Sequence, residues 1–152
     1  DFVWASNEYP VASQGFFIYT HPFNGKSSIT TEALVKARNE FAKRIPGPAD
    51  GSYMATVKRI PNIEDDGYVD FLPQRKVVKI NGREWIELRG FWEVKGDFMG
   101  GPFVSYTTLD ERTGKLLTLD CYVYSPKLGK RNFLRPLEHL VYMTHFPTSA
   151  AK

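Results

Sequence analysis

The sequence has a single cysteine, no long hydrophobic run and only a small net charge, and each shortage excludes a class of protein. Cys121 alone cannot form an internal disulfide, and it argues against a zinc site. No segment approaches the ~20 apolar residues of a membrane helix, and no signal peptide is visible. A formal charge of +3 is too small to indicate nucleic-acid binding, so no nucleic-acid partner is expected.

Motifs for catalysis and metal binding are also missing. His21, His139 and His145 are unclustered, and no pair has the i, i+4 spacing of a metal site on a helix. The Gly-x-Ser-x-Gly elbow of a serine hydrolase does not occur. The glycine-rich segment 96–102 lacks the Lys-Ser/Thr of a phosphate loop, and a strand-like run follows where such a loop needs a helix. We therefore expect neither a metal nor a cofactor.

What is present is the composition of one soluble globular domain over residues 1–152, with 42% hydrophobic and 14% aromatic residues. Between Thr31 and Ile45, the residues Leu34, Ala37 and Phe41 follow one stripe of an amphipathic helix. A second helix is predicted over residues 131–143. Aromatic and β-branched runs predict strands at 15–20, 52–59, 75–80, 83–95, 103–109 and 115–124, with an extended segment at 1–14 and an exposed excursion at 61–73.

Two turns fix the pairing of the later strands. Asn81-Gly82 between two strand-like runs is typical of a two-residue type I′ hairpin, which places Lys79 opposite Glu84 and Lys76 opposite Glu87. A further hairpin is predicted through residues 110–114, with Gly114 in the left-handed position. The fold class is therefore α+β: a twisted, mainly antiparallel sheet of about five to six strands with two helices packed on one face.

Alternation along the strands predicts which side chains face the helices. Leu88 and Trp92 are expected on the core side, together with Leu119 and Cys121, so Cys121 is interpreted as a small buried hydrophobe. The opposite face would be rich in charged and aromatic side chains. With the tip of the glycine-rich loop, it supplies the candidate contact residues: Trp85, Arg89, Phe91, Glu93, Asp97, Phe98, Met99, Asp120, Tyr122 and Tyr124.

That face has two interpretations. Tyr, Trp and Arg are enriched at binding hot spots, which favours a recognition surface, including one that docks another part of the same polypeptide. Cross-strand aromatic pairs also stabilise ordinary solvated sheet faces. Paired acids such as Glu87 with Glu93, or Asp97 with Asp120, are available for hydrolysis. Salt bridges from these acids to Arg89 or Lys95 are the simpler expectation.

Several strings of the sequence resemble one family. They are Gly15-Phe16-Phe17-Ile18-Tyr19, Ile45-Pro46-Gly47-Pro48 with Gly51-Ser52-Tyr53-Met54, the glycine-rich segment from Arg89 to Tyr106, and Tyr122-Val123-Tyr124-Ser125-Pro126 with Lys130-Arg131 and Leu137-Glu138. Nearly the whole chain resembles domain of unknown function family 4837 of the Bacteroidetes. The resemblance implies a secreted envelope lipoprotein about twice this length, of which this chain is the C-terminal portion, and it implies no activity. A boundary inside a longer protein fits the apolar start Phe2-Val3-Trp4.

The leading hypothesis is therefore a non-enzymatic binding or assembly module of the cell envelope, on the periplasmic side or as an outer-membrane lipoprotein. Its expected partners are the missing N-terminal half of the same protein and an envelope protein or glycan. Contact with the membrane is expected only through a lipid anchor outside this chain. The alternative is a hydrolase-like enzyme acting on envelope glycan or peptide, with Asp97, Glu93, Asp120 and Arg89 as its candidate residues.

Overall fold

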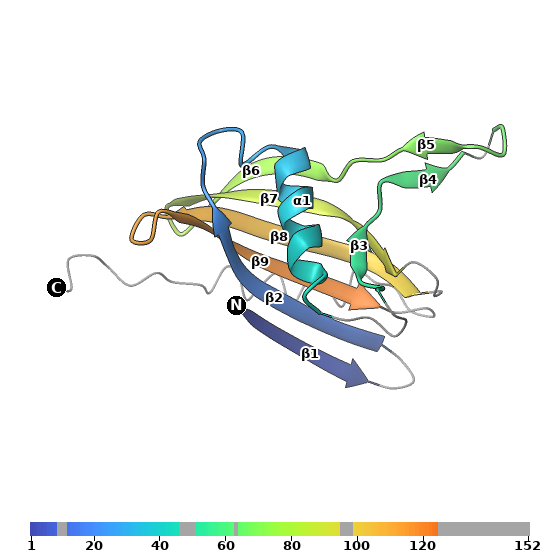
Figure 1. Cartoon of the computed structure of the whole chain (residues 1–152), viewed down its shortest axis with the longest axis horizontal. Helices are drawn as coiled ribbons and strands as arrows, with labels where there is room; N and C mark the ends of the chain where they lie inside the picture. The colour runs from blue at the N-terminus through green and yellow to red at the C-terminus, as the bar shows by residue number, and fades with distance from the viewer. Residues whose placement is uncertain (9–11, 46–50, 63, 95–98, 125–152) are drawn as a thin grey trace.

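The protein is an antiparallel sheet with one described helix lying across it (Figure 1). The computed structural model describes residues 1–8, 12–45, 51–62, 64–94 and 99–124. Its elements are β1 (Phe2–Glu8), β2 (Ala12–Pro22), α1 (Thr31–Ala42), β3 (Met54–Thr56), β4 (Arg59–Pro61), β5 (Tyr68–Asp70), β6 (Gln74–Ile80), β7 (Arg83–Val94), β8 (Met99–Asp110) and β9 (Lys115–Tyr124). The second predicted helix, 131–143, lies outside the described residues.

The main sheet has seven strands, and every pair is antiparallel. Five of them lie in the order β1-β2-β9-β8-β7. The far edge of β7 is shared: β6 pairs with its first part and β3 pairs with its last residues. The α+β class and the antiparallel sheet are as predicted. The strand beyond the expected five to six is β1, because residues 2–8 of the extended N-terminal segment pair with β2.

Both predicted turns have the expected backbone. Asn81 and Gly82 have φ angles of 52° and 79°, as a type I′ turn requires, and Gly114 has a φ of 68°. The register between β6 and β7 places Lys79 opposite Glu84 and Lys76 opposite Glu87, which confirms the predicted pairing. The glycine-rich segment differs from prediction at one point: its second strand begins at Met99 and not at Phe103.

Helix α1 begins after Thr30, whose hydroxyl accepts a hydrogen bond from the backbone N–H of Ala33 at 3.2 Å. Its buried face includes Leu34 and Phe41, as the periodicity predicts, but the third position differs. Arg38 is buried there, while the predicted Ala37 is only partly buried. A helix otherwise packed by apolar side chains therefore inserts one guanidinium toward the sheet.

The sheet is packed on both faces. Under α1, a first apolar cluster joins Phe41 of the helix to Phe17, Leu88, Trp92 and Phe103 of the strands. A second cluster lies on the opposite face and contains Ile80, Trp85, Val104, Tyr106, Leu119, Cys121 and Val123. Side chains that alternate along a strand are therefore buried on both sides, as they are in the central layer of a layered fold.

The glycine-rich segment brings β7, β8 and β9 unusually close together. A Cβ atom built on Gly101 would lie 1.9 Å from the carbonyl oxygen of Val123, and one on Gly100 would lie 2.9 Å from that of Trp92. The indole N–H of Trp92 donates to the same Val123 carbonyl at 3.2 Å. The absence of a side chain at 101 is thus what lets this core tryptophan bond to β9.

We predict that Gly101→Ala lowers the free energy of unfolding by about 3 kcal/mol, at the upper end of overpacking effects, because a β9 carbonyl cannot yield to the new methyl group. Urea denaturation measures this. Gly67→Ala is the matched control, because its added Cβ meets only the flexible carboxylate of Asp65 at 3.0 Å. Equal effects of the two substitutions would contradict the close-approach explanation.

Candidate functional site

The predicted contact residues lie on two faces of the sheet, not on one. Trp85, Arg89, Phe91 and Glu93 alternate onto the face away from α1, whereas Asp120, Tyr122 and Tyr124 lie on the α1 face. Trp85, Asp120 and Tyr122 are buried, and Phe91 and Glu93 are exposed. Asp97, Phe98 and the side chain of Met99 lie outside what the structure describes. The predicted single contact face is therefore wrong.

The error lies in the register of β9. Glu87 is opposite Tyr106, and Tyr106 is opposite Leu119, so the apolar residues of β9 share a face with Trp85 and not with Leu88. The prediction assumed that only one face is buried and therefore turned Leu119 and Cys121 toward the helix. Because the second cluster buries the other face too, hydrophobicity alone could not decide which residues of β9 face the helix.

The centre of the α1 face is an ion pair. Arg38 Nε donates to Asp120 Oδ2 at 2.8 Å, and the two side chains are 1% and 0% exposed. The same guanidinium donates to the Met54 carbonyl and to Thr56 Oγ1, each at 3.2 Å, and lies 4.0 Å above the centroid of the Phe103 ring. Burial raises the pKa of Asp120, and the neighbouring guanidinium opposes that rise.

Polar side chains extend from this ion pair along β9. Thr118 Oγ1 lies 2.7 Å from Thr107 Oγ1 and 2.8 Å from His21 Nε2, so a short hydrogen-bonded row crosses from β8 through β9 to β2. Burial lowers the pKa of His21. Burial also raises the pKa of the Tyr19 hydroxyl, and the negative charge of Asp120 adds to that rise. His21 therefore favours its neutral form, which suits a structural hydrogen bond.

We predict that Arg38→Met lowers the free energy of unfolding by about 3–5 kcal/mol, because it leaves the Asp120 carboxylate buried without its cation. Adding Asp120→Leu should restore part of that loss, since the double variant has no buried charge. Urea denaturation of the two single variants and the double variant gives the coupling energy. Lys36→Met, an exposed cation on the same helix, serves as the control. Simple additivity would show that the pair is not energetically coupled.

A second carboxylate is held on the opposite face. Glu87 Oε1 accepts from Arg89 Nε at 2.8 Å, and Glu87 Oε2 accepts from the Tyr106 hydroxyl at 2.9 Å. This confirms the salt bridge expected between Glu87 and Arg89. Burial alone would raise the pKa of Glu87, but the hydrogen bonds from Arg89 and Tyr106 outweigh it and hold the pKa below 4.5.

We predict that Glu87 makes stability depend on pH in the acid range. The pKa of Glu87 is lower in the folded chain than in the unfolded chain. Its contribution to the free energy of unfolding is therefore complete above about pH 4.5 and is lost as the pH falls through the folded pKa. Glu87→Gln should therefore flatten the fall of unfolding free energy below about pH 5. Denaturation at several pH values checks this, and parallel profiles for both proteins would refute it. Arg89→Met should make the fall smaller, because it removes the hydrogen bond and the charge that lower the folded pKa of Glu87.

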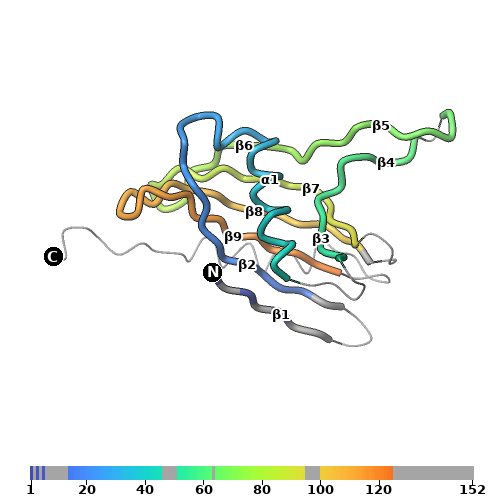
Figure 2. Tube along the Cα trace, viewed as in Figure 1, coloured from blue at the N-terminus to red at the C-terminus, as the bar shows by residue number. Residues whose placement is uncertain are grey.

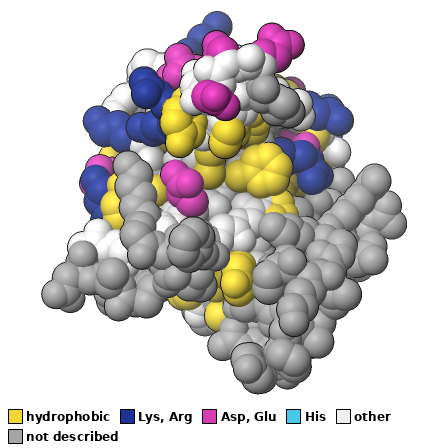
Figure 3. All heavy atoms as spheres, turned by 90° about the vertical axis from the view of Figure 1, so that its right-hand side faces the viewer, with side chains coloured by type: hydrophobic (Ala, Val, Ile, Leu, Met, Phe, Trp, Pro, Cys, Tyr) yellow, Lys and Arg dark blue, Asp and Glu magenta, His cyan; other side chains and the backbone are white. Residues whose placement is uncertain are grey.

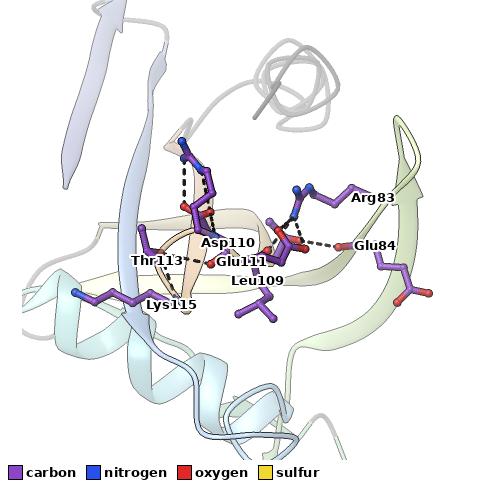
Figure 4. A network of polar contacts seen from close by, with 9 residues as sticks. Arg83, Glu84, Leu109, Asp110, Glu111, Thr113 and Lys115 are labelled. Carbon is purple, nitrogen blue, oxygen red and sulfur yellow. Dashed lines mark hydrogen bonds and ion pairs between the residues drawn. The ribbon is translucent and has the colours of Figure 1, made fainter. Parts of the chain in front are cut away.

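A further polar network lies where the β6–β7 and β8–β9 turns approach each other (Figure 4). Arg83 Nη1 donates to the Leu109 carbonyl at 2.8 Å and pairs with Glu111 Oε2 at 3.1 Å. Asp110 in turn pairs with Arg112 at 3.3 Å, and the Thr108 hydroxyl donates to the Glu84 carbonyl. Beside this network is a cleft of about 630 Å³, which we call the β6 cleft because Arg75 and Val77 of that strand line it.

The two most exposed apolar side chains lie elsewhere, on residues 58–72, which we call the arm. The chain leaves β3, runs out through β4 and returns through β5 into β6, so the arm stands away from the sheet (Figure 2). Tyr68 is 70% exposed, Leu72 54% and Phe91, at the base of the arm, 48%. Ile60 and Val69 are opposite each other on β4 and β5 and are also exposed.

The exposed excursion predicted at 61–73 contains a hairpin that the sequence did not indicate. The register pairs Ile60 with Val69 and Pro61 with Tyr68, and the Asn62 N–H donates to the Gly67 carbonyl at 2.8 Å to close the tip. Strands this short give little periodic signal, and a two-stranded hairpin is only marginally stable alone. The arm is attached by the Phe71 ring, whose centroid lies 5.8 Å from that of Phe91.

The described part of the chain offers little for other kinds of site. It contains no group of acidic, histidine or cysteine side chains that could hold a metal ion. Cys121 is buried, as predicted, but in the cluster away from α1. Of the helices that the structure describes, none has the length and apolar character to cross a membrane.

The architecture defines the chain as an α+β protein with one described helix on a seven-stranded antiparallel sheet and a projecting hairpin. The chain belongs to the family DUF4837, a domain of unknown function, whose model matches residues 1–143. The resemblance to that family is therefore confirmed. No curated protein and no solved structure matches the chain.

Proposed function

We propose that this chain is a non-enzymatic binding or assembly module of the bacterial cell envelope, and that its contact surface is the arm. We define the arm surface as Ile60, Tyr68, Val69, Leu72 and Phe91. The single observation that carries the proposal is the exposure of these side chains on a hairpin that projects from the sheet.

The arm surface has the composition and placement of a binding element. Figure 3 views the molecule from the side where the arm projects and shows hydrophobic side chains gathered below acidic ones. Fully burying a Leu, Val or Phe side chain stabilises a contact by about 1.5–3 kcal/mol. Tyrosine also supplies a hydroxyl at the end of a large apolar ring, which suits a hot spot at an interface.

Three of the predicted contact residues support this location. Phe91 belongs to the arm surface, and Arg89 alternates onto the same face of β7 with its side chain 41% exposed. Glu93 is exposed on that face as well. The proposed contact surface therefore includes Phe91 from the predicted face, but most of its residues belong to the arm.

The residues named for a hydrolase do not support that alternative. Asp120 is buried under α1 and engaged by Arg38, while Glu93 and Arg89 lie on the other side of the sheet. Asp97 is outside the described residues. Two carboxylates that act on one bond must flank a shared cleft, and a sheet separates Asp120 from Glu93.

The envelope setting is supported by the family resemblance, which implies a secreted lipoprotein with a larger N-terminal part. Under this proposal, the arm surface binds either that N-terminal half or another envelope component. Both partners would cover the same apolar side chains, so one experiment addresses both.

We predict that a photo-crosslinking amino acid at Leu72, placed in the full-length protein in cells, forms crosslinks in the envelope fraction. The same probe at Val3, which is 44% exposed on the edge strand β1, is the matched control and should form few. Western blots of fractionated cells measure both. The proposal fails if the protein fractionates away from the envelope, or if position 72 crosslinks no more than position 3.

A further inference from the structure

The arm enters β6 at one end, and the β6 cleft extends along the strand from Arg75 to its other end. The arm precedes Gln74, where β6 begins, and the cleft is lined by Asn81 and Gly82, where the strand has ended. A seven-residue strand spans about 20 Å. The arm points away from the sheet at its own end (Figure 1), so it does not reach the cleft of its own chain.

The β6 cleft offers apolar side chains at its surface. Phe23 and Val77 both line it, and they are 37% and 53% exposed. Ile29 and Leu116 add further apolar lining. Its volume, about 630 Å³, is within the range of about 300–1,000 Å³ of sites that bury a small ligand or an inserted side chain. An exposed aromatic ring beside a hollow of this size is suited to receiving another apolar projection.

Charge on the two features is complementary. The arm tip carries Glu64, Asp65 and Asp66 with no neighbouring cation in the tip, and all are exposed. Strand β6 carries exposed Arg75, Lys76 and Lys79 and no acid.

Most acids on the strands and turn beside β6 are already engaged. Arg83 holds Glu111 and Arg89 holds Glu87, whereas Glu84 lies opposite Lys79 and offsets part of the charge of that strand. Lysines on an edge strand also discourage uncontrolled strand pairing, so the features favour a side-chain contact over an added strand.

We propose that the arm of one copy docks in the β6 cleft of a second copy, with Tyr68 inserted against Phe23 and Val77 and the acidic tip along β6. This inference rests on the proposed function, because it names the partner of the arm surface. The contact joins two different patches, so it is heterologous. Repeated, it produces a ring if the rotation closes and a filament if it does not.

Sedimentation velocity of the 152-residue chain over a range of concentrations tests the proposal. The wild-type chain should self-associate, and less so at high salt, because exposed charges are screened. A tip variant (Glu64→Lys, Asp65→Lys, Asp66→Lys) and an edge variant (Arg75→Glu, Lys76→Glu, Lys79→Glu) should each weaken association at least about tenfold. A wild-type chain that stays monomeric throughout overturns the proposal.

Recombining the reversals makes the test specific. A chain carrying both the tip and the edge reversals regains complementary charges and should associate again, and an equimolar mixture of the two single-site variants should also associate. Association that is unchanged in every variant, or that the doubly reversed chain fails to recover, overturns arm-to-cleft docking. Circular dichroism and thermal unfolding confirm that each variant is folded.

The apolar part has its own variants. Tyr68→Ser in the arm and Val77→Ser in the cleft should each reduce association, whereas Val3→Ser on the edge strand β1 should leave it unchanged. Failure here is distinguishable from failure of the proposed function. A monomeric chain whose position 72 still crosslinks to a different envelope protein would refute self-assembly and leave the binding role of the arm intact.

Discussion

The ion pair between Arg38 and Asp120 is the interaction on which the α1 side of this fold depends. One guanidinium contacts α1's partners on β3, β8 and β9 at once, through Thr56, Phe103 and Asp120. Burying two charges is costly unless the geometry is good, so a shift of the helix by one turn or of β9 by one residue would leave a charge without its partner. The pair therefore fixes the position of the helix on the sheet, and the apolar contacts around it add stability.

Packing on both faces of the sheet has a consequence for recognition. In the described part of the sheet, both faces of the central strands carry buried side chains, because one cluster lies under α1 and another contains Trp85, Tyr106 and Leu119. The aromatic residues that looked like a binding surface in the sequence are mostly core residues. Exposed apolar side chains are concentrated at the ends of the sheet instead, on the arm and around the β6 cleft, which is where contacts with other chains are available.

Local chemistry explains which predictions were confirmed. The Asn81-Gly82 turn needs positive φ angles that these two residues tolerate, so the turn and the register of Lys79 with Glu84 could both be predicted. Thr30 caps α1 by a contact with Ala33, only three residues away. The arm was harder to predict, since its strands of three residues carry no usable alternation. The exposure of Tyr68 and Leu72 agrees with the predicted excursion at 61–73, but the pairing within it could not be predicted.

By itself, the sequence determined the α+β class, the β6–β7 and β8–β9 hairpins, the extent of α1 within a few residues and membership of a family. The tertiary structure decided the rest, because it depends on contacts between distant segments. Strand β2 pairs with β9 across about a hundred residues of chain, and Phe17 meets Asp120 only through that pairing. The face of Leu119, the burial of Arg38 and the need for glycine at 101 all follow from which strands are neighbours. Periodicity shows which side chains of one strand share a face, but only the pairing between strands shows whether that face lies toward α1.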